Sequence, residues 1–273
     1  MDRDLSFLRQ ATNDDLEPLV GYILNAELSE TLSINDKFKQ HWPNHHQYVD
    51  LIEREIRDFG GNTFANAFRI LFDRRPISYD EIVHDVADKL DVPYQEDSPI
   101  STIEDDILLA VMINAWPKMT EQEREELSSI TDVKVDIPCH IPSSVPFIAL
   151  QAAIRMGGFA SYQIAVIIAN AVATTLVGHG LRIATNAALT RSLAIFAGPI
   201  GWVITGIWTA IDIAGPAYRV TIPCVLQLAM LRHKYSVPAE QRSGILASDT
   251  PSLPGPKAPR LGYQDSGRIG YQG

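Results

Sequence analysis

Apolar residues recur at a helical spacing through the first 130 positions of the chain. Ile52, Ile56 and Phe59 form one such stripe, which stops at Gly60 and Gly61. Similar stripes follow at Ile82, Val86 and Leu90, and at Ile103, Ile107 and Val111. Because side chains three to four positions apart share one face of a helix, each stripe is expected to pack into a core. The front half is therefore predicted to be a multi-helix, all-α domain.

Four helix starts are marked by a Ser or Thr that is followed three positions later by Asp or Glu. In this arrangement each side chain can bond the backbone amide of the other residue, which satisfies donors that a first helical turn leaves unpaired. The four pairs are Thr12 with Asp15, Ser78 with Glu81, Ser101 with Glu104, and Thr120 with Glu123. Helices are expected to begin at these points.

The second half contains two long segments without charged residues. One runs for 26 residues from Met156 to Leu181, and the other runs for 20 residues from Ser192 to Ile211. A helix that crosses a bilayer needs roughly 20 mostly apolar residues, so both segments are long enough. Gly178-His179-Gly180 predicts a turn within this region. The pattern therefore predicts an apolar helical hairpin.

Small side chains form a row along the first of these segments, at Ala165, Ala169 and Ala173. Such a row lets two helix backbones approach closely, either in lipid or in a soluble bundle. The sequence thus predicts a close-packed hairpin and leaves open which of these two environments surrounds it.

The last helix is expected to run from Cys224 to about Tyr235, with Arg232, His233 and Lys234 at its negative end. The residues just before Pro223 should be extended, because the position preceding a proline avoids the helical conformation. Proline itself suits the first turn of a helix.

The organisation of the chain follows from these patterns and from the prolines near residue 140. We expect an acidic α-helical domain at 1–140 and an apolar helical-hairpin module at 147–235 that packs with it or follows it. After Val237 the composition changes to Pro, Gly and Ser, which predicts a disordered tail at 236–273.

The net charge of −10 is divided unevenly between the two halves. Residues 1–140 hold 13 basic and 29 acidic residues, a net of −16, whereas residues 141–273 hold 10 and 4, a net of +6. The acidic half would repel phosphates and the later Arg residues form no stripe, so nucleic acid is not expected as a partner. The charged N-terminus lacks the apolar segment of a secretory signal, which predicts a cytoplasmic protein.

No pattern of residues indicates an enzyme. The motifs of P-loop, Rossmann, serine-hydrolase and HExxH enzymes are missing from the sequence. His41, His45 and His46 with Asp50 have a metal-ligand spacing, but Pro43 lies among them and their neighbours are polar. A solvated surface is the favoured interpretation of this group. No catalytic residue, cofactor or metal is expected.

Charged or titratable residues within the apolar half are the functional candidates. They are His179, Arg182, Arg191, Asp212 and Arg219. At the predicted hairpin turn, His179 would suit either a pH-sensitive tip or a hydrogen-bonded loop. Asp212 needs a partner whether lipid or protein surrounds it, and an ion pair with one of the three arginines is expected.

Six segments of the sequence resemble the YaaW family of uncharacterised bacterial proteins. The most specific is GPAYRVTIPCVLQLAMLR at 215–232. The others are DLSFLRQATNDDLEPLV at 4–20, FGGNTFANAFR at 59–69, YDEIVHDVADKLDV at 79–92, WPKMTEQEREEL at 116–127 and GHGL at 178–181. The family is grouped with ubiquinol–cytochrome c chaperones, so the resemblance implies an assembly or chaperone-like role. It supplies no catalytic residues.

Three functions agree with these patterns. In the first, a non-enzymatic protein uses its 147–235 module to engage an apolar client surface or a membrane, by conditional insertion or pore formation as colicin-like proteins do in bacterial competition or defence. In the second, the hairpin is the buried core of a soluble assembly chaperone. The third is a metal-dependent enzyme built on the His41 group. The expected partners are a protein client or a membrane, with peripheral or conditional association with the inner membrane, and homo-oligomerisation is left open.

Overall fold

The computed structural model describes residues 2–25, 30–61, 77–130, 145–177, 181, 198–203, 205–206 and 217–237. Every regular element within these ranges is a helix, which confirms the predicted all-α class. The α-helices are α1 (Asn13–Leu24), α2 (Glu30–Ile34), α3 (Asp36–His41), α4 (Val49–Gly61), α5 (Tyr79–Lys89), α6 (Ile100–Ala115), α7 (Glu121–Ile130), α8 (Val145–Met156), α9 (Gly158–Val177) and α11 (Tyr218–Ser236). The 3₁₀ helices are η1 (Arg3–Gln10), η2 (His45–Tyr48) and η4 (Trp116–Lys118).

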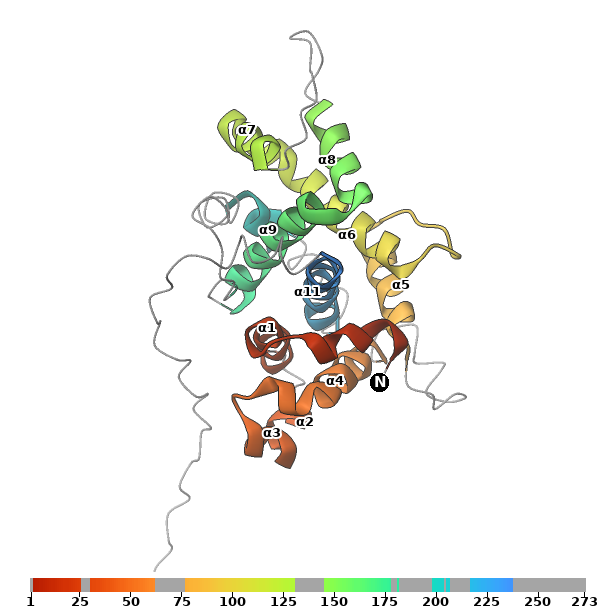
Figure 1. Cartoon of the computed structure of the whole chain (residues 1–273), viewed down its shortest axis with the longest axis vertical. Coiled ribbons are helices and arrows are strands. Elements are labelled where there is room, and N and C mark those ends of the chain that lie inside the picture. Colours follow the sequence, from red (N-terminus) through yellow and green to blue (C-terminus); the bar gives the residue numbers. More distant parts are fainter. Residues whose placement is uncertain are drawn as a thin grey trace, which may run out of the picture.

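Helix α11 occupies the centre of the structure. Figure 1 shows it surrounded by α1, α4, α5, α6 and α9, and each of these helices contacts it. Every residue from Val220 to Leu231 is buried. A helix buried on all sides needs partners around its whole circumference, and the helices of the front half supply most of them.

The prediction of an extended segment before Pro223 is wrong, because α11 begins at Tyr218 and includes this proline. Proline lacks a backbone donor and normally ends or kinks a helix. The preceding turn is nevertheless closed, since the amides of positions 220 and 221 both donate to the carbonyl of Ala217 at 3.0 Å. Val220 and Ile222 are fully buried, and this burial favours the helix over the conformation that the local sequence prefers.

Helix α9 combines a membrane-like composition with a position in the core. Among the described residues it is the one helix long and apolar enough to cross a bilayer, over Ala160–Val177, a test that core helices of soluble proteins also pass. In the structure 67% of this window is buried, and α11 is the main partner of the helix. The predicted row of Ala165, Ala169 and Ala173 is buried along its length, as close helix packing requires.

Polar residues near the end of α9 are satisfied locally. The hydroxyl groups of Thr174 and Thr175 donate to the carbonyls of Asn170 and Ala171 in the same helix, each at 2.8 Å. The side chain of Asn170 accepts from the backbone amide of Leu181 at 3.0 Å. Neither threonine therefore needs a partner from another helix.

Three of the four predicted helix starts are confirmed. At α1, α5 and α7 the side chains of Thr12, Ser78 and Thr120 accept from the backbone amide three residues further on. The remaining one is wrong, because α6 begins at Ile100 without a side-chain cap and Ser101 lies inside the helix. The glutamate expected to complete that cap has partners in other helices.

Helix α4 is described as far as Gly61, and the residue before it sets the distance between two helices. A Cβ atom on Gly60 would lie 2.5 Å from Cγ1 of Ile82 in α5. No real Cβ contact is this short, so the approach of α4 to α5 depends on the absence of a side chain.

Several predicted features lie outside the described residues. They are the hairpin turn at 178–180, most of the second apolar segment at 192–211, the boundary near residue 140 and the tail from residue 238 onward. The domain limits therefore stay a prediction. In the described part, residues from the acidic half and the apolar half contribute to one hydrophobic core.

Candidate functional site

Four consecutive polar residues lie at the end of helix α11, and each contacts an acidic side chain of a surrounding helix. Because an α-helix has about 3.6 residues per turn, neighbouring positions point in different directions. The first two residues contact α6 and the last two contact α1. We call this set the α11 clamp, and its members are Arg232, His233, Lys234 and Tyr235 with their partners Asp15, Glu104 and Asp105.

The contact between Arg232 and Glu104 is bidentate. Arg232 Nε lies 2.6 Å from Glu104 Oε2, and its Nη2 lies 3.2 Å from Oε1. The hydroxyl of Tyr79 also donates to Oε1, at 2.6 Å, so the carboxylate has three donors although Glu104 is only 1% exposed. Burial alone would lower the pKa of Arg232, but the Glu104 carboxylate outweighs it and raises this pKa above its usual range. Arg232 is therefore held in its charged form.

Asp15 receives the other end of the clamp. Lys234 Nζ lies 2.5 Å from Asp15 Oδ1, and the hydroxyl of Tyr235 donates to Oδ2 at 2.7 Å. The same Oδ2 accepts from the backbone amide of Thr12 at 3.1 Å, which completes the cap of α1. Burial would raise the pKa of Asp15, but Lys234 and the hydrogen bonds from Tyr235 and Thr12 together lower it. One carboxylate thus serves both as a helix cap and as a long-range ion-pair partner.

His233 joins α11 to two further helices. Its Nε2 lies 2.6 Å from Asp105 Oδ1 of α6, and Ser161 Oγ of α9 lies 3.0 Å from Nδ1 and 3.2 Å from Nε2. A serine-hydrolase triad has the same residue types, but there the serine and the acid use different ring nitrogens and the serine is open to substrate. Here Ser161 Oγ is within reach of both ring nitrogens, and the serine is only 1% exposed, so a substrate could not reach it. The arrangement links helices and does not present a nucleophile.

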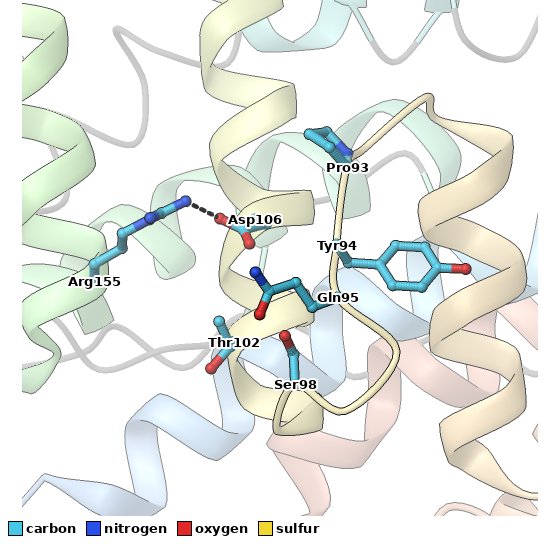
Figure 2. A pocket seen from close by; sticks show the side chains of 7 residues that line it. All are labelled: Pro93, Tyr94, Gln95, Ser98, Thr102, Asp106 and Arg155. Atoms are coloured by element: carbon cyan, nitrogen blue, oxygen red, sulfur yellow. Dashed lines mark hydrogen bonds and ion pairs between the residues drawn. The ribbon is translucent and has the colours of Figure 1, made fainter.

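A polar cavity of about 400 Å³ lies beside the clamp, between the loop at 93–98, α6 and α8. It is lined by Pro93, Tyr94, Gln95, Ser98, Thr102, Asp106 and Arg155. Figure 2 shows Arg155 directed at Asp106, with 2.8 Å between Nη2 and Oδ1, and the Tyr94 ring directed away from this pair. Because these two charges neutralise each other, the cavity presents no single charge to a ligand.

The prediction that His41, His45 and His46 form a solvated surface is wrong for His45. His45 is only 3% exposed, and its Nδ1 shares a 2.5 Å hydrogen bond with the Tyr48 hydroxyl. Its ring also packs edge-on against Trp42. Burial lowers the pKa of His45 to about 4, so the ring is neutral. The apolar neighbours at positions 38, 42 and 48 come together only after folding, which the local polarity does not reveal.

The structure places one of the five predicted functional candidates. Arg219 lies half-buried in the first turn of α11. The other four, His179, Arg182, Arg191 and Asp212, lie outside the described residues, so the role of His179 in the turn and the ion pair of Asp212 stay predictions. Among the described residues no group of three His, Cys, Asp or Glu side chains could hold a metal ion.

The acidic members of the clamp were not predicted as functional residues. Asp15 and Glu104 were expected to cap helices, and Asp105 had no expected role. The sequence nevertheless contained an indication, because three adjacent basic residues end a segment that is otherwise apolar, in a chain whose other half is strongly acidic. Cations at the edge of a core need acidic partners, and the acidic half is where such partners had to be found.

Proteins similar to this chain are found in two bacterial species. A UPF0174 protein of Helicobacter pylori strain J99 is 36% identical over 249 residues, which cover 89% of this chain and 96% of that protein. A second one from the same strain is 35% identical over 209 residues, or 76% and 98% of the two chains. The UPF0174 protein YaaW of Escherichia coli K12 is 29% identical over 245 residues, or 86% and 95%. No family model and no solved structure matches the chain.

Proposed function

The chain belongs to the UPF0174 family, and we propose that it is a non-enzymatic helical protein whose apolar half engages a membrane conditionally. In this proposal the protein is cytoplasmic in its closed state and associates with the inner membrane when the 147–235 module opens. Defence or bacterial competition is a biological setting in which such a protein would act. The observation that carries the proposal is α9, a helix of membrane-spanning length that is mostly buried against α11 and α8 and also contacts α1 and α6 of the acidic half.

The polar groups of α9 support this proposal. In hydrocarbon each backbone and hydroxyl group must find its partner within the helix, because no water is available. Thr174 and Thr175 already donate to carbonyls of their own helix. The helix carries no charged residue over Ala160–Val177, so its transfer from the core to a bilayer would strand no ion.

A disulfide lock provides a direct test. A Cβ atom on Gly21 of α1 would lie 3.8 Å from Cβ of Val177 in α9, which is about the mean Cβ separation in disulfides. We therefore expect Gly21→Cys with Val177→Cys, in a background where Cys139 is replaced by Ser, to join α9 to α1 on oxidation. Cys224 is fully buried and can stay.

The assay compares oxidised and reduced protein on vesicles of phosphatidylglycerol and phosphatidylethanolamine, at neutral and acidic pH. Dye leakage and resistance of the bound protein to a carbonate wash are measured. The reduced protein should bind the vesicles and cause leakage, and the oxidised protein should not. The single variant Gly21→Cys, which cannot form the disulfide, should give the same binding and leakage under oxidising and reducing conditions. Equal leakage in both states, or complete recovery of the reduced protein in the soluble fraction, would contradict the proposal.

A soluble, assembly chaperone-like role is the second candidate, with the hairpin as a permanent core. Its support is the small number of large apolar side chains that are exposed in the described part of the chain, namely Ile34, Ile113, Met156 and Trp202. A protein that never opens needs no exposed apolar patch of its own in this region. For this function the oxidised Gly21→Cys/Val177→Cys variant should bind its client as well as the reduced variant does, because client binding would not require release of α9.

A further inference from the structure

The α11 clamp joins groups of opposite charge from the two unequal halves of the chain. Its two cations, Arg232 and Lys234, belong to residues 141–273, which carry a net charge of +6, and its three acids belong to residues 1–140, which carry −16. An anionic surface would attract the first group and repel the half that contains the second. An anionic surface would therefore weaken the contacts between the basic and acidic members of the clamp.

The cations of the clamp are more open to solvent than most of their partners. The side chains of Arg232, His233 and Lys234 are 26%, 13% and 19% exposed, whereas those of Glu104 and Asp15 are 2% and 4% exposed. An external anion can thus reach Arg232 and Lys234 at the edge of the bundle while the carboxylates that pair with them stay covered. Lys234 is the simplest target, because its ammonium group has three donors that rotate freely about the end of a flexible stem.

We propose that anionic phospholipid headgroups compete with the acidic members of the clamp for these cations, and that this competition releases α9. The inference rests on the proposed membrane function and names the surface that triggers it. Basic segments near a bilayer are attracted to anionic headgroups over a distance of about a Debye length. A zwitterionic bilayer lacks this attraction and would leave the clamp closed.

His233 connects the clamp to the apolar helix. Its ring contacts Asp105 of α6 on one side and Ser161 of α9 on the other. When a headgroup draws the end of α11 outward, α9 loses its polar contact to this ring and its packing against α11 together. The same neighbourhood offers a control, because Asp106, the next residue of α6, pairs with Arg155 of α8 at the exposed edge of the cavity.

The experiment uses the full chain and three substitutions, Asp105→Asn, Asp106→Asn and Lys234→Gln. Amide exchange of the α9 peptides is followed by mass spectrometry without lipid, and far-UV circular dichroism verifies that each variant is folded. Flotation then measures binding to vesicles of phosphatidylcholine alone and of phosphatidylcholine with phosphatidylglycerol. Inorganic phosphate at matched ionic strength replaces the vesicles in a separate arm.

Without lipid, we expect D105N to speed exchange in α9 roughly tenfold, the effect of losing one charge-assisted hydrogen bond, and D106N to change it less than about twofold. D105N should bind the anionic vesicles more tightly than the wild type. K234Q should also exchange faster but bind them no more tightly, because it has lost a headgroup ligand. High salt should weaken all binding, and free phosphate should leave exchange in α9 unchanged.

Each alternative result overturns a defined part of the inference. Equal exchange in D105N and D106N would show that the clamp does not hold α9. If K234Q binds anionic vesicles as tightly as D105N does, the clamp cations do not recognise headgroups. If free phosphate speeds amide exchange in α9, no bilayer is required for its release. If none of the proteins binds either kind of vesicle, the membrane function itself fails and the lipid trigger fails with it.

Discussion

Substitutions of Arg232 and Glu104 should have strongly non-additive effects on the free energy of unfolding. Removing one partner of a buried ion pair leaves the other charge uncompensated, which typically costs about 3–5 kcal/mol. Arg232→Met would leave a carboxylate that is 1% exposed with one remaining side-chain donor, Tyr79, so about 4 kcal/mol is expected. Glu104→Gln keeps the shape and one acceptor, and about 3 kcal/mol is expected because the Arg232 side chain is partly exposed.

The double variant E104Q/R232M removes both charges and leaves neither one unpaired. Its loss should therefore be smaller than that of R232M alone, about 2 kcal/mol and not the sum of about 7 kcal/mol, which gives a coupling free energy of about 5 kcal/mol. Urea unfolding at pH 7 measures the free energy of unfolding of the wild type and the three variants. An unchanged slope of this free energy against urea concentration would show that the proteins expose similar surface on unfolding.

A second pair of similar geometry serves as the control. Lys37 Nζ lies 2.5 Å from Asp50 Oδ1, but these side chains are 44% and 59% exposed. The equivalent cycle with Lys37→Met and Asp50→Asn should give a coupling below about 1 kcal/mol, because water screens an exposed pair. Equal coupling in the two cycles, or additive losses at the clamp, would refute the argument that burial sets the strength of these contacts.

Four further substitutions test other parts of the fold. Gly60→Ala should destabilise by about 1–3 kcal/mol, because its Cβ would collide with Ile82, whereas Gly61→Ala, which has open space, should change thermal unfolding little. Burial lowers the pKa of His45 to about 4, so the stability it contributes is complete above about pH 6.5 and is lost as the pH falls toward 4. That loss of up to about 3 kcal/mol in urea titrations should disappear in His45→Gln. Leu226→Ala in α11 should cost about 2–5 kcal/mol in the same assay, because the side chain is fully buried.

The sequence predicted the helices better than it predicted their partners. Stripes such as Ile52, Ile56 and Phe59 are buried as expected, because periodicity records which face of a helix meets the core. The errors arose where tertiary packing overrides a local preference. Pro223 lies within a helix because its neighbours are buried on all sides, and His45 is covered by aromatic rings that a local pattern does not assemble.

The contacts of the clamp could not be predicted from the sequence for a related reason. Lys234 and Asp15 are separated by 219 positions in the sequence, and Arg232 and Glu104 by 128. The composition alone could not have named the acidic partners of this segment, because 29 acidic residues are present in the front half. Which three of them meet α11 depends on how α1 and α6 pack around it, and this information lies in the tertiary structure.

The clamp alone cannot hold α9 in place, and this defines what it can control. Five large aliphatic side chains of α9 are buried, at positions 164, 166, 167, 168 and 172. At about 2 kcal/mol each, exposing them to water would cost roughly 10 kcal/mol, more than any one clamp contact contributes. In water α9 therefore stays buried whether the clamp is intact or not. Under the proposed membrane function, a bilayer would remove most of that cost, since its hydrocarbon would replace the protein core. The polar contacts at the end of α11 then become the main barrier, so a change of a few kcal/mol in the clamp should alter membrane insertion much more than it alters solubility.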